Sequence, residues 1–415
     1  MCRWRSGRNI RQYVREVCDR KRNGKKVERK IKKIGETAFY TALVLEMLFV
    51  LLDKSAYIIP YETWWFRLTF AMFVCKIACT KYTFKEWICI LLFGILGLVS
   101  FFAADREEII RIVAFVAAFK GIPLRTAAKI TFYETLAGSL VIVLLSVTGI
   151  YGAVSVTGYF RGGGIEETRY CLGMGHPNAL HCMFFAILTL GLALYNQKMK
   201  WYAYLFTFIM NILVFLLTDS RTGLLVCTVT ILFALFLHYG GKFREKRGLY
   251  ILASVFILFC VLLTLIISIY GVEIPILRQI DIRINGRFQW GKTGGGIEYW
   301  RLFGSAANQN YFDMGFLRIF YWYGIIPGIL YTCLLVIMIW GCYKNKAYDA
   351  FLVVMMFSAY TLIEAHAVSV YIGRNYILLF MGAMWYTLLG QADTEEYFFR
   401  IFRFLKRSMY AEYKA

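Results

Sequence analysis

The sequence predicts an all-α fold, a polytopic transmembrane helical bundle of about twelve spans with both termini in the cytoplasm. The chain has 415 residues, of which 59% are hydrophobic, and its mean hydropathy is +0.56. Its apolar stretches recur at roughly the 20-residue length that crosses a bilayer. The loops between these stretches alternate between strongly basic and mixed in charge. These observations exclude a soluble globular protein and indicate one membrane-embedded domain.

The apolar stretches divide the chain into three parts. A basic cytoplasmic segment (1–35) precedes the bundle (36–390), and a basic cytoplasmic tail (391–415) follows it. Two long loops, 151–175 and 271–312, interrupt the bundle and are expected to face outward. The expected spans are 38–52, 64–80, 87–103, 108–120, 128–150, 177–195, 201–217, 222–239, 249–270, 315–341, 350–365 and 374–390.

Several of these spans carry charged residues, which are costly in lipid and usually face the bundle interior. Glu46 and Glu134 lie within the first and fifth spans and are expected to point inward. The fourth span is short and contains Arg111, so it is tilted, re-entrant or only half a span.

The distribution of basic residues sets the orientation. The loops expected inside are CKIACTKYTFK, FKGIPLRTAAK, NQKMK, GGKFREKR and YKNKAY, all rich in Lys and Arg. The segment from Met1 to Lys33 has 14 basic residues against 3 acidic ones. Such segments mark the cytoplasmic side and attract anionic lipid headgroups or a partner. The net charge of +21 therefore does not indicate nucleic-acid binding, since no reader motif accompanies it.

No cleavable signal peptide is expected, because no apolar run with a small-residue cleavage site closely follows the basic start. The first span would act as its own insertion signal.

Three arginines lie where apolar spans end on the outward side. They are Arg169 in TRYCLGMGHPN, Arg221 in TDSRTG and Arg287 in GRFQWGK. An arginine near lipid is a candidate functional residue, because it must face a bundle interior or a wet cavity. Guanidinium groups that converge on one cavity suit a phosphate or diphosphate, which they bind through paired hydrogen bonds.

Each of these segments also has a purely structural interpretation. Arg169 and the helix start at His176 can form a simple interfacial loop, or can hold an anion together with the helix N–H groups. Asp219 or Ser220 can cap the helix that begins near Arg221, leaving this arginine to extend toward water.

Two motif searches give negative results. GRFQWGKT matches the phosphate-loop pattern, but that motif needs a preceding strand and a following helix, and the GGG that follows here opposes a helix. His176 and His181 are five residues apart and do not share a helical face in the i, i+4 manner. No metal site and no cofactor are therefore expected.

The ordered set of outward motifs resembles a known family. R-x-x-x-G-x-x-HPN and SRTG each precede a span, and GRFQW, RLFG and YFDMGFLRIFYWYGIIPG follow in order. Together they resemble the Wzy-type polysaccharide polymerases, which share a superfamily with the O-antigen ligases. The resemblance extends from about Arg169 to Gly328 and includes the overall topology.

The resemblance implies a GT-C-like bundle that acts without a metal. A hydroxyl of one undecaprenyl-diphosphate-linked glycan would attack the anomeric carbon of another, and lipid diphosphate would leave. Carried over by position, Arg169, Arg221 and Arg287 would contact diphosphate, with Arg287 also acting in catalysis. The other residues assigned to substrate binding are His176, Asn178, Arg301 and His366.

An attacking hydroxyl also needs a base. Ligases of the superfamily place a histidine ahead of the Y-G-I-I-G-like helix, whereas this chain has Asp313 near that point. This difference favours a polymerase and makes Asp313 the candidate base, with capping of the following helix as its alternative role. Glu364 is the second candidate base, or else forms an interfacial pair with His366.

The expected function is polymerisation of lipid-linked repeat units into a surface or capsular polysaccharide at the outer face of the bacterial cytoplasmic membrane. The alternatives are a ligase that transfers polymer to an acceptor, and a flippase or exporter, which would need charges along a path through the bundle. Expected partners are undecaprenyl-diphosphate-linked glycans, membrane lipids, a flippase and a chain-length regulator.

Overall fold

The computed structural model describes residues 7–159, 166–365, 368–388 and 396–397. Within these residues the chain forms fifteen α-helices and two small two-stranded antiparallel sheets. The expected all-α class is therefore confirmed. His366, and most of the tail that starts at residue 391, lie outside the described residues.

The helices follow the chain in a simple order. The longer ones are α1 (Gly7–Lys54), α2 (Glu62–Ala78), α3 (Phe84–Ala104), α4 (Glu108–Ala118), α5 (Leu124–Val147), α6 (Pro177–Tyr195), α7 (Trp201–Thr218), α8 (Arg221–Tyr239), α9 (Arg247–Tyr270), α13 (Ile325–Asn345), α14 (Tyr348–Thr361) and α15 (Ile377–Leu388). The shorter ones are α10 (Pro275–Arg283), α11 (Arg287–Gly295) and α12 (Gly315–Trp322), and the 3₁₀ turns are η1 (Asn196–Lys198), η2 (Gly241–Glu245), η3 (Ile297–Tyr299) and η4 (Ile372–Arg374).

The strands are short and pair locally or near the chain ends. They are β1 (Lys81–Tyr82), which pairs with β4 (Glu396–Tyr397), and β2 (Ser155–Gly158), which pairs with β3 (Glu167–Tyr170). In the β2–β3 hairpin, Arg169 lies opposite Val156.

Eight helices in the described part of the chain are long and apolar enough to cross a membrane. The protein is therefore a multi-pass helical membrane protein. Each of the other expected spans also falls on helix, but α4, α14 and α15 have only 11, 14 and 12 residues. The expected total of about twelve spans and the cytoplasmic placement of both ends stay predictions.

The expected span 315–341 is wrong as a single helix, because the chain breaks it into α12 and α13 at Gly324. Gly324 has φ of 99°, a conformation that side chains with a Cβ rarely adopt. Its neighbour Ile325 donates its backbone N–H to the carbonyl of Arg301, 2.9 Å away. The outward loop therefore docks onto this break.

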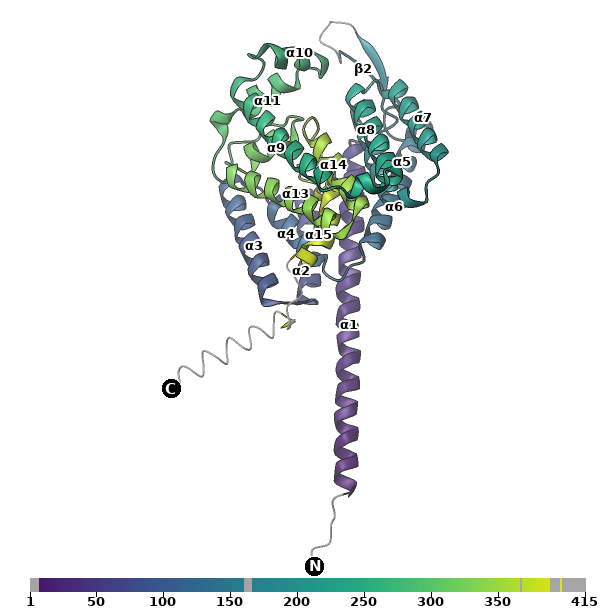
Figure 1. Cartoon of the computed structure of the whole chain (residues 1–415), viewed down its shortest axis with the longest axis vertical. Coiled ribbons are helices and arrows are strands. Elements are labelled where there is room, and N and C mark those ends of the chain that lie inside the picture. Colours follow the sequence, from purple (N-terminus) through teal and green to yellow (C-terminus); the bar gives the residue numbers. More distant parts are fainter. Residues whose placement is uncertain (1–6, 160–165, 366–367, 389–395, 398–415) are drawn as a thin grey trace, which may run out of the picture.

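The loop 271–312 is also more ordered than expected. It contains α10 and α11, and Gly294 and Gly295 lie in the last turn of α11 despite their weak helix propensity. Figure 1 places β2, α10 and α11 at one end of the molecule, opposite the end from which α1 extends. Both long loops thus share one face.

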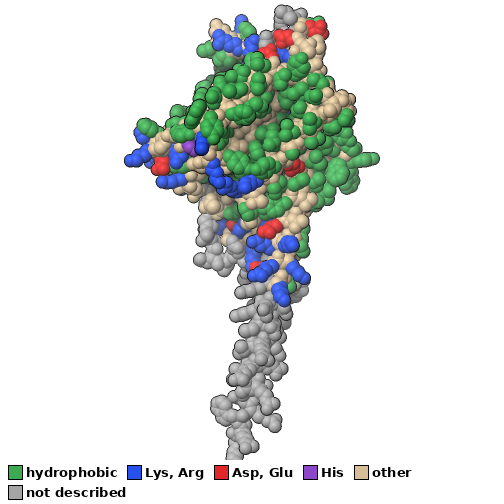
Figure 2. All heavy atoms as spheres, turned by 90° about the vertical axis from the view of Figure 1, so that its right-hand side faces the viewer, with side chains coloured by type: hydrophobic (Ala, Val, Ile, Leu, Met, Phe, Trp, Pro, Cys, Tyr) green, Lys and Arg blue, Asp and Glu red, His purple; other side chains and the backbone are tan. Residues whose placement is uncertain are grey.

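The surface of the bundle fits a lipid environment. Figure 2 shows a broad area of hydrophobic side chains on the face that it draws, with Lys and Arg gathered below it and charges of both signs above it. Exposed leucines also occur on α3, α7 and α9, for example Leu91, Leu216 and Leu252. In water this apolar area would be unfavourable, whereas lipid tails accept it.

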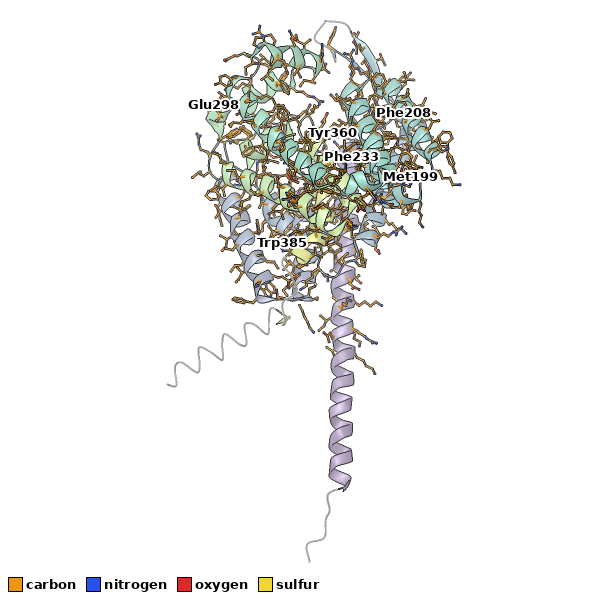
Figure 3. The ribbon with its side chains drawn as sticks, in the orientation of Figure 1. Met199, Phe208, Phe233, Glu298, Tyr360 and Trp385 are labelled. Carbon is orange, nitrogen blue, oxygen red and sulfur yellow. The ribbon has the colours of Figure 1, made fainter. Side chains whose placement is uncertain are left out.

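The centre of the bundle is formed by α12 and α14, together with parts of α6. Every residue of α12 is buried, and a helix that is buried on all sides belongs in a core. Tyr360 lies inside the bundle (Figure 3), where its ring packs at 4.7 Å from that of Phe185. This packing joins α14 to α6, and Gly315 at the start of α12 lies close to Thr361 at the end of α14.

Glu46 and Arg111 face the interior as expected, whereas Glu134 is half-buried. The Arg111 guanidinium lies 3.1 Å from the Glu46 carboxylate, and both side chains are almost fully buried. Thr69 of α2 donates a 2.6 Å hydrogen bond to the same carboxylate. The pair therefore ties α4 to α1 and α2, which is consistent with the shortness of α4.

Candidate active site

A polar pocket lies where β3, the α7–α8 turn and the α10–α11 turn meet. Its cavity of about 20 Å³ has room for one or two water molecules and is smaller than a diphosphate. A larger anion would extend beyond this cavity toward solvent, because the pocket is partly open and Arg221 at its edge is exposed. The pocket is lined by Arg169, Asn178, Asp219, Ser220, Arg221, Thr222, Arg283, Ile284, Asn285 and Arg287.

Strand β3 aims Arg169 into this pocket. Side chains two apart on a strand share a face, so Glu167 lies beside Arg169 and accepts a 2.6 Å hydrogen bond from it. The Asp219 carboxylate approaches the same guanidinium from the α7–α8 turn, at 3.3 Å. Two acids therefore hold Arg169, whose side chain is buried.

The α7–α8 turn places Arg221 differently. Asp219 ends α7 in the left-handed region, with φ of 49°, and Ser220 precedes α8 without a capping bond from its side chain. Capping by the Ser220 side chain is therefore wrong, and Asp219 pairs with Arg169. Arg221 is exposed and, within the described part of the chain, forms no hydrogen bond or ion pair.

The α10–α11 turn sets Arg287 at a helix start. Asn285 and Gly286 both have positive φ, which reverses the chain between the two helices. The Asp281 carboxylate accepts a 2.7 Å hydrogen bond from the backbone N–H of Phe288 and so satisfies the start of α11 from the preceding helix. Arg283, on the last turn of α10, joins the pocket.

Arg287 connects the pocket to both candidate bases. Its guanidinium lies 3.3 Å from the Asp313 carboxylate and 2.5 Å from that of Glu364, and it also donates to the carbonyl of Ile363. Its own side chain is only 10% exposed. The Arg287 side chain therefore joins α11 to the residues just before α12 and just after α14, which are distant in sequence.

The two carboxylates differ in access. The Asp313 side chain is 53% exposed, whereas that of Glu364 is 13% exposed. The capping role considered for Asp313 is wrong, since α12 follows Met314 and has no capping bond from a side chain. Burial raises the pKa of Glu364, which lies beyond the end of α14, and the positive charge of Arg287 opposes this rise.

His176 and Asn178 form the start of α6 beside these groups. The Nδ1 atom of His176 accepts a 3.1 Å hydrogen bond from the backbone N–H of Asn178. Burial lowers the pKa of His176, and Asp313 opposes this while Arg169 reinforces it. A neutral imidazole with an accepting Nδ1 presents its proton on Nε2. The arginines, rather than the histidine, therefore supply the positive charge here.

Of the residues expected at the site, Arg301 does not line the pocket. Arg301 is exposed and donates to the carbonyls of Glu298 and Trp300, at 3.1 and 3.0 Å. Glu298 lies at the edge of the molecule near α11 (Figure 3), and Arg301 does not line the pocket. The expectation for Arg301 is therefore not supported by its position. His366 lies outside the described residues.

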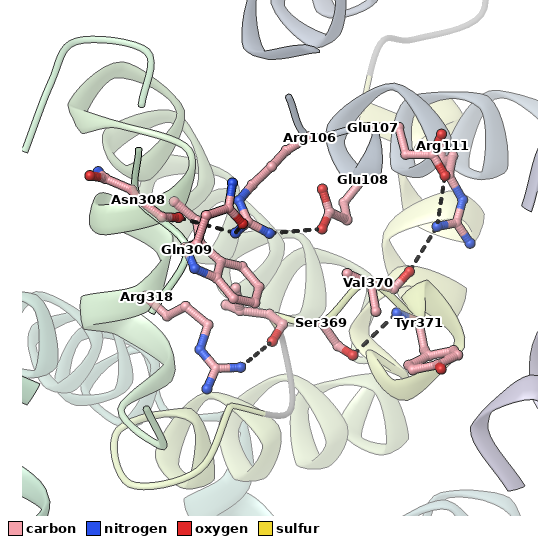
Figure 4. Close-up of polar contacts among 12 residues, drawn as sticks. Arg106, Glu107, Glu108, Arg111, Asn308, Gln309, Arg318, Ser369, Val370 and Tyr371 are labelled. Carbon is pink, nitrogen blue, oxygen red and sulfur yellow. Dashed lines mark hydrogen bonds and ion pairs between the residues drawn. The ribbon is translucent and has the colours of Figure 1, made fainter. Parts of the chain in front are cut away.

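A second group of polar contacts joins α4, the outward loop and the chain before α15 (Figure 4). Arg106 contacts the Glu108 carboxylate at 3.4 Å and the Asn308 carbonyl at 3.2 Å. Arg111 donates a 2.8 Å hydrogen bond to the carbonyl of Val370. These contacts connect the start of α4 to the outward loop and to the chain before α15, and so fix the surroundings of the site.

The sequence did not single out several basic residues in and around the site. Arg283 was only one of five basic residues in the loop, and its position four residues before Arg287 was its only distinguishing signal. Lys54, Arg318 and Arg374 lie at the edges of expected spans, where a basic residue is usually read as an interfacial anchor.

The chain was compared with family models, with curated proteins and with solved structures, and nothing matched. Among the residues that the structure describes, no three His, Cys, Asp or Glu side chains are grouped so that they could hold a metal ion. The chemistry that the site can perform is therefore argued from its arginines and carboxylates.

Proposed function

We propose that the protein is a membrane glycosyltransferase that polymerises undecaprenyl-diphosphate-linked repeat units at the outer face of the bacterial cytoplasmic membrane. The observation that supports this most is the position of Arg287 between a pocket of arginines and two carboxylates. Such a site can bind a departing anion at the arginines and accept a proton at a carboxylate, because Arg287 touches both.

The pocket supplies the anion-binding half of the reaction. Arg169, Arg221, Arg283 and Arg287 bind the diphosphate of the donor lipid through charge-assisted hydrogen bonds. Negative charge grows on this group as its bond to the anomeric carbon breaks, and fixed cations aimed at it lower the barrier. Arg221 binds first, since it is exposed and has no acid to release.

The carboxylates supply the other half. The hydroxyl oxygen of the acceptor sugar forms a bond to the anomeric carbon, its proton moves to Asp313, and the diphosphate leaves with the electron pair of the broken C–O bond. Asp313 fits the role of base because half of its side chain is exposed. Glu364 fits the role of a buried support that holds Arg287 in place.

Ion-pair exchange accounts for the small size of the pocket. The acids that hold Arg169 and Arg287 neutralise them while no substrate is bound. A diphosphate carries more charge than any one of these carboxylates and can displace them. Displacement of Asp313 from Arg287 also releases its carboxylate to meet the acceptor hydroxyl.

Asp313→Asn in the producing strain tests this function. Asparagine keeps the shape of the side chain but cannot take a proton, so we expect surface glycan reduced to single repeat units at normal protein level. Glu298→Gln is the matched control, since Glu298 lies at the edge and pairs with Lys292. Polymer of normal length in Asp313→Asn contradicts the assignment.

A strain that lacks the protein separates the alternative functions. Single repeat units on the surface agree with a polymerase. Full-length polymer that is not attached to its acceptor would instead identify a ligase, and lipid-linked units retained inside the cell would identify a flippase or exporter. The crowding of the pocket arginines at one end of the molecule favours the polymerase over an export path.

A further inference from the structure

A second group of cations lies near Asp313 but outside the arginine pocket. Lys54 ends α1, Arg318 lies on α12, and Arg374 ends η4. Arg374 is within electrostatic range of both of the others, so three positive charges from distant parts of the sequence share one region. None of them lines the pocket that the proposed function uses.

These cations have few acidic partners. The Arg374 guanidinium lies 3.8 Å from the Asp53 carboxylate and 3.3 Å from the Ser369 hydroxyl. Lys54 forms no hydrogen bond or ion pair with any residue that the structure describes. Arg318 donates to the carbonyls of Phe312 and Val368, and it has no carboxylate within 4 Å among the described residues.

Burial makes positive charges that lack a contacting carboxylate energetically unfavourable. Arg318 is only 7% exposed, and its guanidinium lies 4.7 Å from the centre of the Trp322 ring. The Nε atoms of Arg318 and Arg374 are buried and have no hydrogen-bond partner. A buried cation without an acid is unfavourable near lipid and marks a functional site by default. The group therefore suits an anionic ligand.

The group is also open enough for a ligand to reach it. The Arg374 side chain is 20% exposed and Lys54 is half-buried, whereas Arg318 lies behind them. A guanidinium presents parallel N–H donors that a carboxylate accepts, and the unpaired Nε–H of Arg374 becomes one of them only when the side chains that bury it move aside. Lys54 adds a point charge to the same anion.

An anion bound by these cations would lie close to the residues of the proposed reaction. Arg318 is within electrostatic range of Asp313 and binds the carbonyl of Phe312, the residue before it. Lys54 is within range of Glu364 and of His176. The anion therefore lies near the reacting atoms. The donor diphosphate occupies the arginine pocket, and the acceptor diphosphate lies a whole repeat unit away from its attacking hydroxyl.

We propose that Lys54, Arg318 and Arg374 bind the carboxylate of an acidic sugar, of the uronic acid class, next to the glycosidic bond that forms. The glycan that the protein polymerises is then acidic. This inference rests on the proposed function for its place in the reaction, but the binding site itself can be tested without any polymerisation.

Saturation-transfer NMR on the full chain in zwitterionic lipid nanodiscs tests the site with sodium glucuronate, glucose and inorganic phosphate as probes. We expect glucuronate to bind and glucose not to bind. Lys54→Gln and Arg374→Gln should each weaken glucuronate binding about tenfold or more, the scale of one charge-assisted hydrogen bond. Arg301→Gln, at the edge of the molecule, is the matched control and should bind as the unmodified protein does.

Any other result of the binding experiment contradicts the proposed carboxylate site. Equal binding of glucose removes the charge requirement, and phosphate that displaces glucuronate at far lower concentration identifies a phosphate site instead. Glucuronate binding that survives both variants places the ligand elsewhere. Arg318→Lys, which keeps the buried charge, serves where Arg318→Gln fails to fold. Glucuronate binding together with normal polymer in Asp313→Asn would sink the proposed function and leave this site intact.

Discussion

Replacement of Arg287 by Gln is the most informative single perturbation of the site. Arg287 has two roles in the proposed mechanism: it stabilises the departing diphosphate, and it neutralises Glu364 inside the protein. Glutamine is uncharged and shorter, so it loses the 3.3 Å contact with Asp313 and the 2.5 Å contact with Glu364 together. Activity and stability should both fall, for separate reasons.

The two losses have different sizes. Removal of one donor that is aimed at developing negative charge typically lowers the rate about 10²–10³-fold, or roughly 3–4 kcal/mol. Loss of one partner from a buried ion pair costs at most about 3–5 kcal/mol of stability. The cost is smaller where the stranded acid can bind a proton, and burial already raises the pKa of Glu364.

Arg287→Gln combined with Glu364→Gln separates the two effects. The double variant has no stranded carboxylate, so its thermal unfolding temperature should return toward that of the unmodified protein. Its rate of glycan polymerisation should stay about 10²–10³-fold low, because the cation that meets the diphosphate is still absent. Polymerisation is measured as chain length on a glycan ladder at matched protein level. Recovery of both properties in the double variant would refute the catalytic role of Arg287.

Further perturbations distinguish binding, protonation, backbone strain and membrane placement. Arg221→Gln should raise the substrate concentration needed for half-maximal rate and leave the unfolding temperature unchanged, since Arg221 is exposed and pairs with no described residue. Activity should fall as pH decreases through the raised pKa of Glu364, above 4.5, because the protonated acid no longer holds Arg287. As the pH falls through this range, the folded state binds the Glu364 proton more tightly than the unfolded chain does, so the stability of the protein should rise. A pH–rate profile checks the loss of activity, and thermal unfolding at the same pH values checks the gain of stability. Glu364→Gln should abolish both pH dependences. Gly324→Ala should destabilise by more than about 1 kcal/mol, measured by unfolding, since φ is 99° and the added carbon would meet the backbone of Gly304. Removal of residues 1–33 should reduce the amount of protein in the membrane more than the rate per inserted molecule, and a lower rate in correctly inserted protein would contradict this.

The helices were predictable because span length and hydrophobicity are local properties of the sequence. The inward orientation of Arg111 and Glu46 was also predictable, since these two charges could pair only inside the bundle. The break at Gly324 was not predictable in the same way. It depends on the backbone of the distant loop, where the carbonyl of Arg301 accepts from Ile325, and apolar residues flank it on both sides.

The site was predictable as a set of residue types but not as a set of contacts. The three arginines predicted from their places at the outward ends of spans all line the same cavity as Arg283. Asp219 and Ser220 were the candidate helix caps, because capping is a local rule. Its pairing with Arg169 arises only when the β2–β3 hairpin folds over the α7–α8 turn.

The contacts of Arg287 also order the steps of the proposed reaction. While Asp313 is paired with this guanidinium, its carboxylate is held in an ion pair. A bound diphosphate competes for the same guanidinium, so the carboxylate is released to meet the acceptor hydroxyl only after the leaving group has arrived. Water that reaches Asp313 in the absence of a donor meets a carboxylate that is still held by Arg287. The same ion pair would thereby limit wasteful hydrolysis of the lipid-linked donor.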